Sequence, residues 1–280
     1  IEENNYEPNL FARLNAKESR IIGLTVPGFN SVTTPRLVEV IVAYLKKNDY
    51  TPLIMHTEND IEEEIRCIER LKNMNVDGIM VLATGSTKEY EEAVKKLKIP
   101  ILFLGQRFPG ENSVINDDYN AGYQAGKWAA QYLVDKGITN INYISLTSAT
   151  TVGRNRSDGF LSALNEADGV TSVNLLHEYL GDSRELFMST FEDALITYPE
   201  INLVFSSSAQ GSLGAYDACT AAARDEVYII GFDNETDEQV LIEQGTQYIA
   251  SVDQLRAEQA EQTIQCVEDY LFNGKTFEIK

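Results

Sequence analysis

Polar side chains follow most of the short apolar runs of this chain, at the points where those runs end. The segments are rich in Ser, Thr, Asn, Gln and Asp and contain isolated arginines. Amides, carboxylates and guanidinium groups form paired hydrogen bonds with neighbouring hydroxyl groups. We therefore expect these segments to recognise a small polyhydroxylated ligand. They are 27–34, 84–86, 105–108, 147–156, 207–210 and 233–236.

Residues that could carry out catalysis or bind a metal are sparse. His56 and His177 are the two histidines, and about 120 residues separate them. The acidic run 58–64 lacks the spacing of a metal-binding loop. There is also no Gly-rich phosphate loop, no nucleophile elbow and no Cys–His pair. We expect no catalytic residues, no metal site and no cofactor, and hence a binding protein rather than an enzyme.

Charge and cysteine usage restrict the partners and the compartment. The net charge is −20, and DNA affinity comes mostly from cations that neutralise phosphates, so this chain alone is not expected to bind DNA. No apolar run approaches the roughly 20 residues that cross a bilayer, and no signal peptide is visible. Cys67, Cys219 and Cys266 are far apart, which is typical of reduced thiols in a cytoplasmic protein.

Short β-rich runs alternate with amphipathic stretches along the whole chain. This alternation predicts an α/β fold of parallel sheets with helices on both faces. Ten strands are many for one sheet, so we expect two Rossmann-like lobes. The predicted strands are 21–26, 51–56, 78–82, 101–104, 113–115, 141–146, 173–178, 203–206, 227–231 and 248–252. The predicted helices are 35–48, 60–74, 87–97, 119–136, 155–167, 184–197, 211–223, 235–244 and 255–272.

The expected domain organisation follows from two predicted crossings between the lobes. One crossing lies at 115–119, between a short strand and a new helix, and the return lies near 251–254. The first lobe then holds 20–115 and 254–280, the second holds 116–253, and 1–19 forms a connector. Ligands of open parallel sheets bind at the carboxyl ends of the strands. The polar segments described above lie at those ends.

The tract 5–24 resembles the hinge of LacI/GalR-family transcription regulators. The matching residues are Tyr6, Pro8, Asn9, Ala12, Arg13, Ser19, Ile22, Gly23 and Leu24. Further matches to the effector domain of that family are 76–80 (VDGIM), Arg156 with 159–160, and 229–233 (IIGFD). The resemblance implies a periplasmic-binding-protein-like fold of type I, with two lobes, three crossovers and an effector in the cleft between them. It also implies that 1–19 is a hinge to a helix-turn-helix domain that the chain lacks.

The resemblance assigns ligand contacts to particular positions. They are Asn30, Ser31, Thr33, Gln106, Arg154, Arg156, Ser208, Asp233 and Gln254. Arg154 beside Arg156, near a helix N-terminus, suits a phosphorylated sugar. Alternatives remain for several residues: Arg156 could form a salt bridge between lobes, Asp233 could cap the helix near 235, and Asp117 and Asp118 could cap the helix that follows them.

Several positions depart from the family pattern. An aromatic segment is replaced by 31–34, and an Asn-Asp pair by Ser208-Ala209, so no effector is carried over from relatives. The residues of the hinge expected on DNA are Pro8, Asn9, Ala12, Arg13 and Leu14. Leu14 lies directly after Arg13, whereas the family leucine comes two residues after the arginine, so its minor-groove wedge is displaced.

The combined expectation is the effector-sensing and dimerisation core of a cytoplasmic LacI/GalR-type regulator, a repressor. It would bind a sugar or sugar phosphate, form a homodimer, and meet operator DNA only through the hinge and the missing domain. An alternative is an extracytoplasmic sugar-binding protein for transport or sensing. Segment 249–254 resembles the C-terminal crossover of that group more than that of the regulators. The hinge tract discriminates between them, because a transport receptor has no use for it.

Overall fold

The computed structural model describes residues 19–29, 33–85, 87–105, 107–108 and 112–274. The chain divides into two compact units. The first unit holds the described residues up to Asn116 and from Leu255 onward, and the second unit is Asp117–Gln254. These limits lie one residue from the expected ones. The chain passes twice between the units, and a third crossover is not found among the described residues. The hinge before Ser19 lies outside the described residues.

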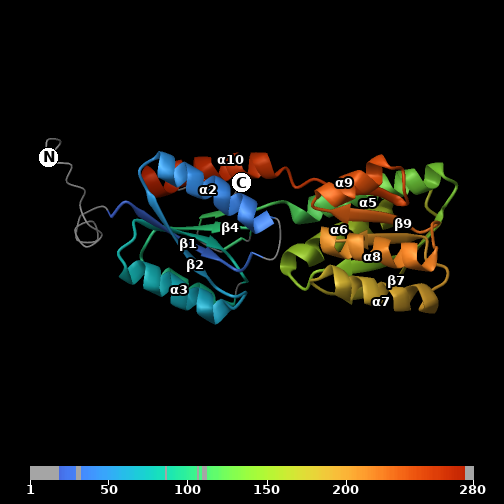
Figure 1. Ribbon diagram of the computed structural model, residues 1–280, viewed down its shortest axis with the longest axis horizontal. Helices are drawn as coiled ribbons and strands as arrows, with labels where there is room; N and C mark the ends of the chain where they lie inside the picture. Colours follow the sequence, from blue (N-terminus) through green and yellow to red (C-terminus); the bar gives the residue numbers. More distant parts are fainter. Residues whose placement is uncertain (1–18, 30–32, 86, 106, 109–111, 275–280) are drawn as a thin grey trace. The chain divides into compact units, whose positions relative to one another are not determined.

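Each unit has its own run of alternating strands and helices (Figure 1). The first unit contains β1 (Ile21–Val26), α2 (Thr33–Lys47), β2 (Thr51–His56), α3 (Ile61–Asn73), β3 (Gly78–Leu82), α4 (Lys88–Lys95), β4 (Ile101–Leu104), β5 (Asn112–Val114), α10 (Arg256–Cys266) and the π-helix η2 (Val267–Phe272). The second unit contains α5 (Asp118–Asp135), β6 (Asn140–Thr147), α6 (Thr151–Glu166), β7 (Ser172–Leu180), α7 (Arg184–Thr197), β8 (Leu203–Ser206), α8 (Ala209–Ala222), β9 (Tyr228–Phe232), α9 (Thr236–Glu243) and β10 (Tyr248–Val252).

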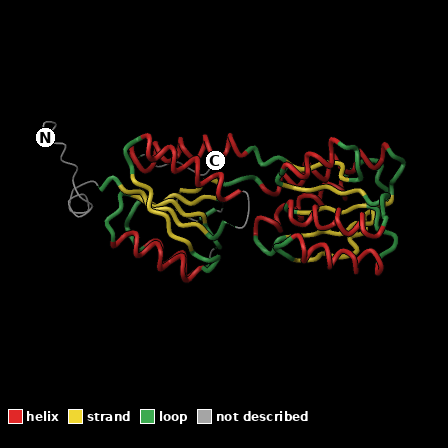
Figure 2. The backbone as a smooth tube through the Cα atoms, in the orientation of Figure 1, coloured by secondary structure: helices red, strands yellow, loops and turns green. Residues whose placement is uncertain are grey.

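Both sheets are parallel and five-stranded, which confirms the predicted fold class (Figure 2). The strand orders are β2-β1-β3-β4-β5 and β7-β6-β8-β9-β10. In each unit the second strand therefore lies at an edge of the sheet. The later strands are added on the opposite side of the first strand, so the order of strand addition reverses between the first and third strands. Ligands of open α/β sheets bind at this switch point, at the ends of the strands. We call that edge of each sheet its carboxyl edge.

Helices bury both faces of the first sheet. The β1 strand is buried along its whole length, as expected for a central parallel strand. One face packs against α3 and α4 through Ile68, Leu71 and Val94. The other packs against α2 and η2, and Figure 1 places α2 and α10 together on that side, opposite α3. A single helix was predicted for 255–272, but it changes to a π-helix after Cys266. The wide turns bring Phe272 onto the Tyr50 ring, at a centroid distance of 4.3 Å.

The second unit is layered in the same way. One face of its sheet is covered by α5 and α6 and the other by α7 and α8. The α5 and α6 helices approach closely because glycines face the crossing: a Cβ atom at Gly122 would overlap the carbonyl oxygen of Arg156, and one at Gly159 would overlap that of Tyr119. This crossing brings the first two turns of α5 against the second and third turns of α6. No described helix has the length and apolar content that would let it span a membrane.

Candidate ligand site

The carboxyl edge of the second sheet gathers four of the residues expected to bind ligand. Arg156 lies on α6 after β6, Ser208 precedes α8, Asp233 follows β9, and Gln254 follows β10. These strands are separated in sequence but adjacent or nearly adjacent in the sheet. The fold therefore brings together residues that the chain places almost 100 positions apart.

Arg156 is at the centre of this cluster and is only 7% exposed. Its Nε donates to Asp118 Oδ1 at 2.8 Å, and Nη1 donates to the carbonyl oxygen of Ser207 at 2.9 Å. The guanidinium carbon lies 3.9 Å from the centroid of the Phe232 ring, in a cation–π arrangement. Nη1 is also 3.8 Å from Asp233 Oδ1. The guanidinium plane is therefore fixed, and its remaining N–H groups have no hydrogen-bond acceptor among the described residues.

The two aspartates at the start of α5 have different partners. Asp117 is the N-cap, and its side chain accepts from the backbone N–H of Asn120 at 3.0 Å. Asp118 is buried and forms the ion pair with Arg156. Burial raises the pKa of Asp118, while the Arg156 guanidinium acts in the opposite direction. Capping was therefore the right interpretation for Asp117 and the wrong one for Asp118, because one cap suffices and the neighbouring carboxylate faces α6.

Asp233 connects three loops of the site. Its Oδ2 accepts from the backbone N–H of Ala209 at 3.2 Å, at the start of α8, and its Oδ1 accepts from Gln254 Nε2. The cap of α9 is Glu235, so the alternative that Asp233 caps this helix is wrong. Asp233 has a φ of 99°, which is a strained conformation for a residue with a side chain. Strain of this kind is common at binding sites, where the surroundings hold it.

Hydroxyl groups line the switch point between β6 and β8. Ser207 Oγ accepts from the backbone N–H of Ser148 at 2.9 Å and so joins the loops after the two strands. Thr147 Oγ1 donates to Glu178 Oε1 at 2.9 Å. Ser208 begins α8 without a side-chain cap hydrogen bond. These loops are therefore held by side-chain contacts before any ligand binds.

The structure does not bring all the expected residues together. Asn30, Ser31 and Gln106 lie outside the described residues, and Thr33 is the first residue of α2. Arg154 is exposed, whereas Arg156 is buried. Residues two apart on a helix point in different directions. The two arginines therefore do not form one phosphate-binding pair in the described structure.

Some residues of this site escaped the sequence analysis. Phe232 supplies the ring under Arg156, and Ser207 supplies a backbone acceptor. Apart from this cluster, the first unit has an aromatic ring of its own: Phe29 follows β1 and is 49% exposed, with its ring centroid 6.1 Å from that of His56 at the end of β2. An exposed aromatic ring after the first strand therefore exists, although the expected aromatic segment is replaced. Its position in the loop after an apolar run, three residues beyond Val26, was the available signal.

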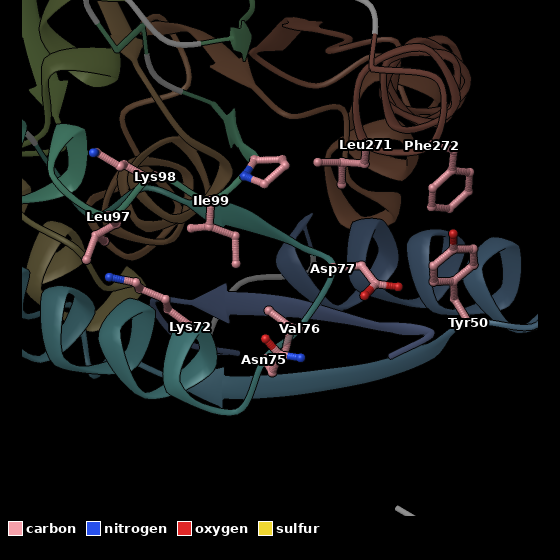
Figure 3. A pocket seen from close by; sticks show the side chains of 11 residues that line it. Tyr50, Lys72, Asn75, Val76, Asp77, Leu97, Lys98, Ile99, Leu271 and Phe272 are labelled. Carbon is pink, nitrogen blue, oxygen red and sulfur yellow. The ribbon is translucent and has the colours of Figure 1, made fainter. Parts of the chain in front are cut away.

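The first unit also has a pocket of about 510 Å³ (Figure 3). Its lining residues are Tyr50, Lys72, Asn75, Val76, Asp77, Leu97, Lys98, Ile99, Pro100, Leu271 and Phe272. Several of these directly precede strands, so the pocket lies at the amino edge of the sheet, opposite the edge where such folds bind ligands. Of its two lysines, Lys72 lies in the last turn of α3 and Lys98 follows α4. Cations at the C-terminus of a helix interact favourably with the helix dipole. We assign no ligand to it.

Comparison with known proteins places the chain in a family. A model of the periplasmic binding protein domain matches residues 22–276. The chain belongs to the periplasmic binding protein domain family. The match spans both units of the chain.

The periplasmic binding protein domain found here has relatives among regulators. The sucrose operon repressor of Staphylococcus xylosus is 28% identical over 236 residues, which cover 83% of this chain and 71% of that repressor. The ribose operon repressor of Escherichia coli strain K12 is 26% identical over 243 residues, covering 84% of this chain and 72% of that protein.

Solved structures with the same fold include proteins that bind small polyhydroxylated molecules. A periplasmic solute-binding protein of an ABC transporter from Actinobacillus succinogenes, with bound D-allose, has a TM-score of 0.79 and 21% identity, covering 92% of this chain and 93% of that one. The myo-inositol binding protein of Caulobacter has a TM-score of 0.81 and 15% identity, covering 95% and 92%. At these identities the likeness shows the fold alone.

Proposed function

We propose that this chain is the effector-sensing core of a LacI/GalR-type transcription regulator, a repressor, and that it binds a sugar or sugar phosphate. The observation that carries the proposal is the Arg156 cluster at the carboxyl edge of the second sheet. The repressors of sucrose and ribose operons, to which the chain is similar over more than four-fifths of its length, support it. A role as an enzyme is not proposed.

The chemistry of the cluster suits neighbouring hydroxyl groups. Asp118 and Ser207 occupy two of the five guanidinium N–H donors of Arg156, so the others remain for ligand oxygens. Asp233 supplies carboxylate oxygens beside them, at 3.8 Å from Nη1. A donor fork next to an acceptor pair matches a vicinal diol, which both accepts and donates. The cleft expected between the lobes stays a prediction.

The regulator hypothesis also needs a path to the N-terminal tract. In the first unit Asp77 accepts hydrogen bonds from the backbone N–H groups of Ser19, at 2.7 Å, and Arg20, at 2.9 Å, and from Ser19 Oγ. These contacts fasten the point where the tract meets β1. Effector binding that favours one arrangement of the domain would shift a pre-existing equilibrium. In a cytoplasmic homodimer, this shift would reach operator DNA through the hinge and a helix-turn-helix domain.

A second candidate function is an extracytoplasmic sugar-binding protein. The observation that favours it is the similarity of the fold to solute-binding proteins of ABC transporters with bound D-allose or myo-inositol. The residues encoded upstream of Ile1 discriminate between the candidates. About 50 residues with a helix-turn-helix pattern support the regulator, as in the family it resembles, whereas a signal peptide contradicts it.

A thermal-shift screen tests the ligand class. The chain is heated with sucrose, D-ribose, D-allose, myo-inositol and the phosphate esters of the first two. Binding to the folded state raises the midpoint by mass action. We expect at least one sugar or sugar phosphate to raise it in the wild type but not in Arg156→Ala. A wild type that responds to none of these compounds, or an equal response in Arg156→Ala, contradicts the proposal.

A further inference from the structure

A buried carboxyl group lies behind the loop that follows β9. Glu238, on the first turn of α9, has no exposed surface. Its Oε1 accepts from the Tyr248 hydroxyl, from Ser251 Oγ at 2.9 Å and from Ser212 Oγ at 3.4 Å. Its Oε2 accepts from the backbone N–H of Glu235 at 2.6 Å. The Tyr248 and Ser251 hydroxyls and the Glu235 N–H all donate to it, whereas the single Ser212 hydroxyl proton has carbonyl acceptors closer, at 3.2 Å. An ionised carboxylate, which only accepts, matches these three donors.

Ser251 connects this carboxyl group to the ligand site. While it donates to Glu238, its Oγ accepts from the backbone N–H of Asn234 at 3.0 Å. Asn234 and Asp233 have φ values of 51° and 99°. Two successive residues with side chains keep such conformations only where their surroundings hold them. The contact from Glu238 through Ser251 is one of the restraints that hold this loop.

Further contacts show how the loop depends on α9 and β10. The Gln239 side chain donates to the Asn234 carbonyl oxygen at 2.8 Å, and Asn234 Nδ2 donates to Asp253 at 3.1 Å. The Asp233 backbone N–H donates to the Val252 carbonyl oxygen at 2.9 Å. The loop is therefore fixed against both elements, and Glu238 is the buried charged group in this set of restraints.

We propose that Glu238 is a positioning residue of the ligand site, which holds the Asp233–Asn234 loop through Ser251 and so sets how tightly sugars bind. When its carboxyl group is ionised, the Ser251 hydroxyl donates to it and turns a lone pair to the Asn234 N–H. When the carboxyl group is neutral, this orientation is no longer enforced and the loop is less restrained. The inference rests on the proposed function, because it concerns the affinity of that same site.

The carboxyl group titrates near neutral pH. Burial raises the pKa of Glu238 to about 7, and the Asp233 charge adds to the rise, while hydrogen bonds from Tyr248, Ser251 and the Glu235 N–H oppose it. The titratable groups that face it are Tyr248, on β10, and Asp233, after β9. Burial also raises the pKa of Tyr248, which keeps that hydroxyl protonated. Sugar affinity is therefore expected to increase as the pH rises through about 7.

Nuclear magnetic resonance of the full chain tests the positioning role without a ligand. The shift of the Asn234 backbone amide is followed from pH 5.5 to 8.5. We expect a transition centred near pH 7 in the wild type and none in Glu238→Gln. Glu64→Gln is a matched control, because Glu64 is also buried and bonded to a tyrosine, Tyr90, but lies in the first unit. A wild-type amide shift without this transition, or a transition that persists in Glu238→Gln, overturns the proposal.

Calorimetric titration with sucrose and with D-ribose then tests the effect on binding. For a sugar that binds, we expect wild-type affinity to be about five-fold weaker at pH 6 than at pH 8. This ratio corresponds to the net contribution of one ordinary hydrogen bond. Glu238→Gln is expected to bind equally at both pH values. The same pH dependence in Glu238→Gln overturns the proposal. If neither sugar binds although the Asn234 transition is present, sucrose and D-ribose are excluded as ligands and the positioning of the loop by Glu238 is supported.

Discussion

Asp117 and Asp118 are neighbours in sequence but have different partners. Asp117 caps α5, whereas Asp118 is the closest carboxylate to a buried guanidinium group. A buried ion pair adds little net stability, but removal of one partner leaves a charge without compensation. The two residues are of the same type and adjacent in the chain, so replacing each in turn tests the effect of its partner.

The first prediction compares Asp118→Ala with Asp117→Ala. Asp118→Ala leaves Arg156 buried with Asp233 at 3.8 Å as its nearest carboxylate, and we expect it to lower the free energy of unfolding by about 3 kcal/mol. Asp117→Ala removes a helix cap, which lowers it by about 1 kcal/mol. Urea denaturation measures both. Equal losses would contradict the assignment of the ion pair to Asp118.

The second prediction concerns stability and pH. The pKa of Glu238 rises from 4.5 to about 7 on folding, so the folded state binds the proton more tightly than the unfolded state. The resulting stabilisation is fully present below about pH 4.5 and is lost as the pH rises through about 7. We expect it to amount to about 3 kcal/mol. It is measured by comparing how the free energy of unfolding depends on pH in the wild type and in Glu238→Gln.

The exposed Glu243, on the same helix, provides the control for this measurement. Glu243→Gln is expected to keep the wild-type decrease in unfolding free energy between pH 5 and pH 8. Glu238→Gln is expected to show a smaller decrease. Parallel curves for wild type and Glu238→Gln would show that Glu238 does not change its proton affinity on folding.

At the scale of elements, the crossing of α5 and α6 creates the ligand site. The glycines at this crossing let Asp118 of one helix reach Arg156 of the other. The third prediction is that Gly122→Ala lowers the free energy of unfolding by about 3 kcal/mol, because its Cβ would overlap a backbone carbonyl oxygen that has little room to move. It should also weaken sugar binding.

Lys127→Ala on the exposed side of α5 is the control for this substitution. Lysine and alanine have similar helix propensities, and an alanine side chain at this exposed position would overlap no other atom. We therefore expect the free energy of unfolding to change by no more than about 0.5 kcal/mol. Chemical denaturation of both variants measures the difference. A Gly122→Ala protein as stable as Lys127→Ala would mean that the two helices do not approach as closely as described.

The elements themselves were predictable from the sequence, but their contacts were less so. Strands such as β1 and β3 coincide with the predicted runs because a buried parallel strand is a short continuous apolar segment. The change to a π-helix after Cys266 gave no such signal. Arg156 and Asp233 were predicted as site residues by resemblance. Asp118 was not, because its role depends on a helix crossing, which local patterns do not report.

At the scale of the whole molecule, the two units differ in how the chain builds them. The second unit is one continuous segment, whereas the first needs residues from both sides of it. The second sheet also has both faces covered by helices of its own segment. These features make the second unit a complete α/β layer structure with its own core.

The fourth prediction is that residues 117–254 fold alone. Expressed as a fragment, this segment should unfold cooperatively in urea, as monitored by circular dichroism, because it keeps every strand and helix of its sheet. The complementary first unit, with its two segments joined by a short linker, provides a comparison. A fragment 117–254 without a cooperative transition would contradict its independence.

The most direct test of the central claim is calorimetric titration of the full chain with the sugar or sugar phosphate that raises its midpoint most. Wild type is compared with Arg156→Lys and with a control, Arg224→Lys. Arg224 donates to the backbone carbonyl oxygens of Leu195 and Pro199 and lies away from the carboxyl edge. We expect Arg156→Lys to weaken binding at least about ten-fold, because lysine cannot reproduce the planar donor fork, and Arg224→Lys to leave it unchanged. Equal affinity of Arg156→Lys and the wild type would contradict a sugar site built on Arg156.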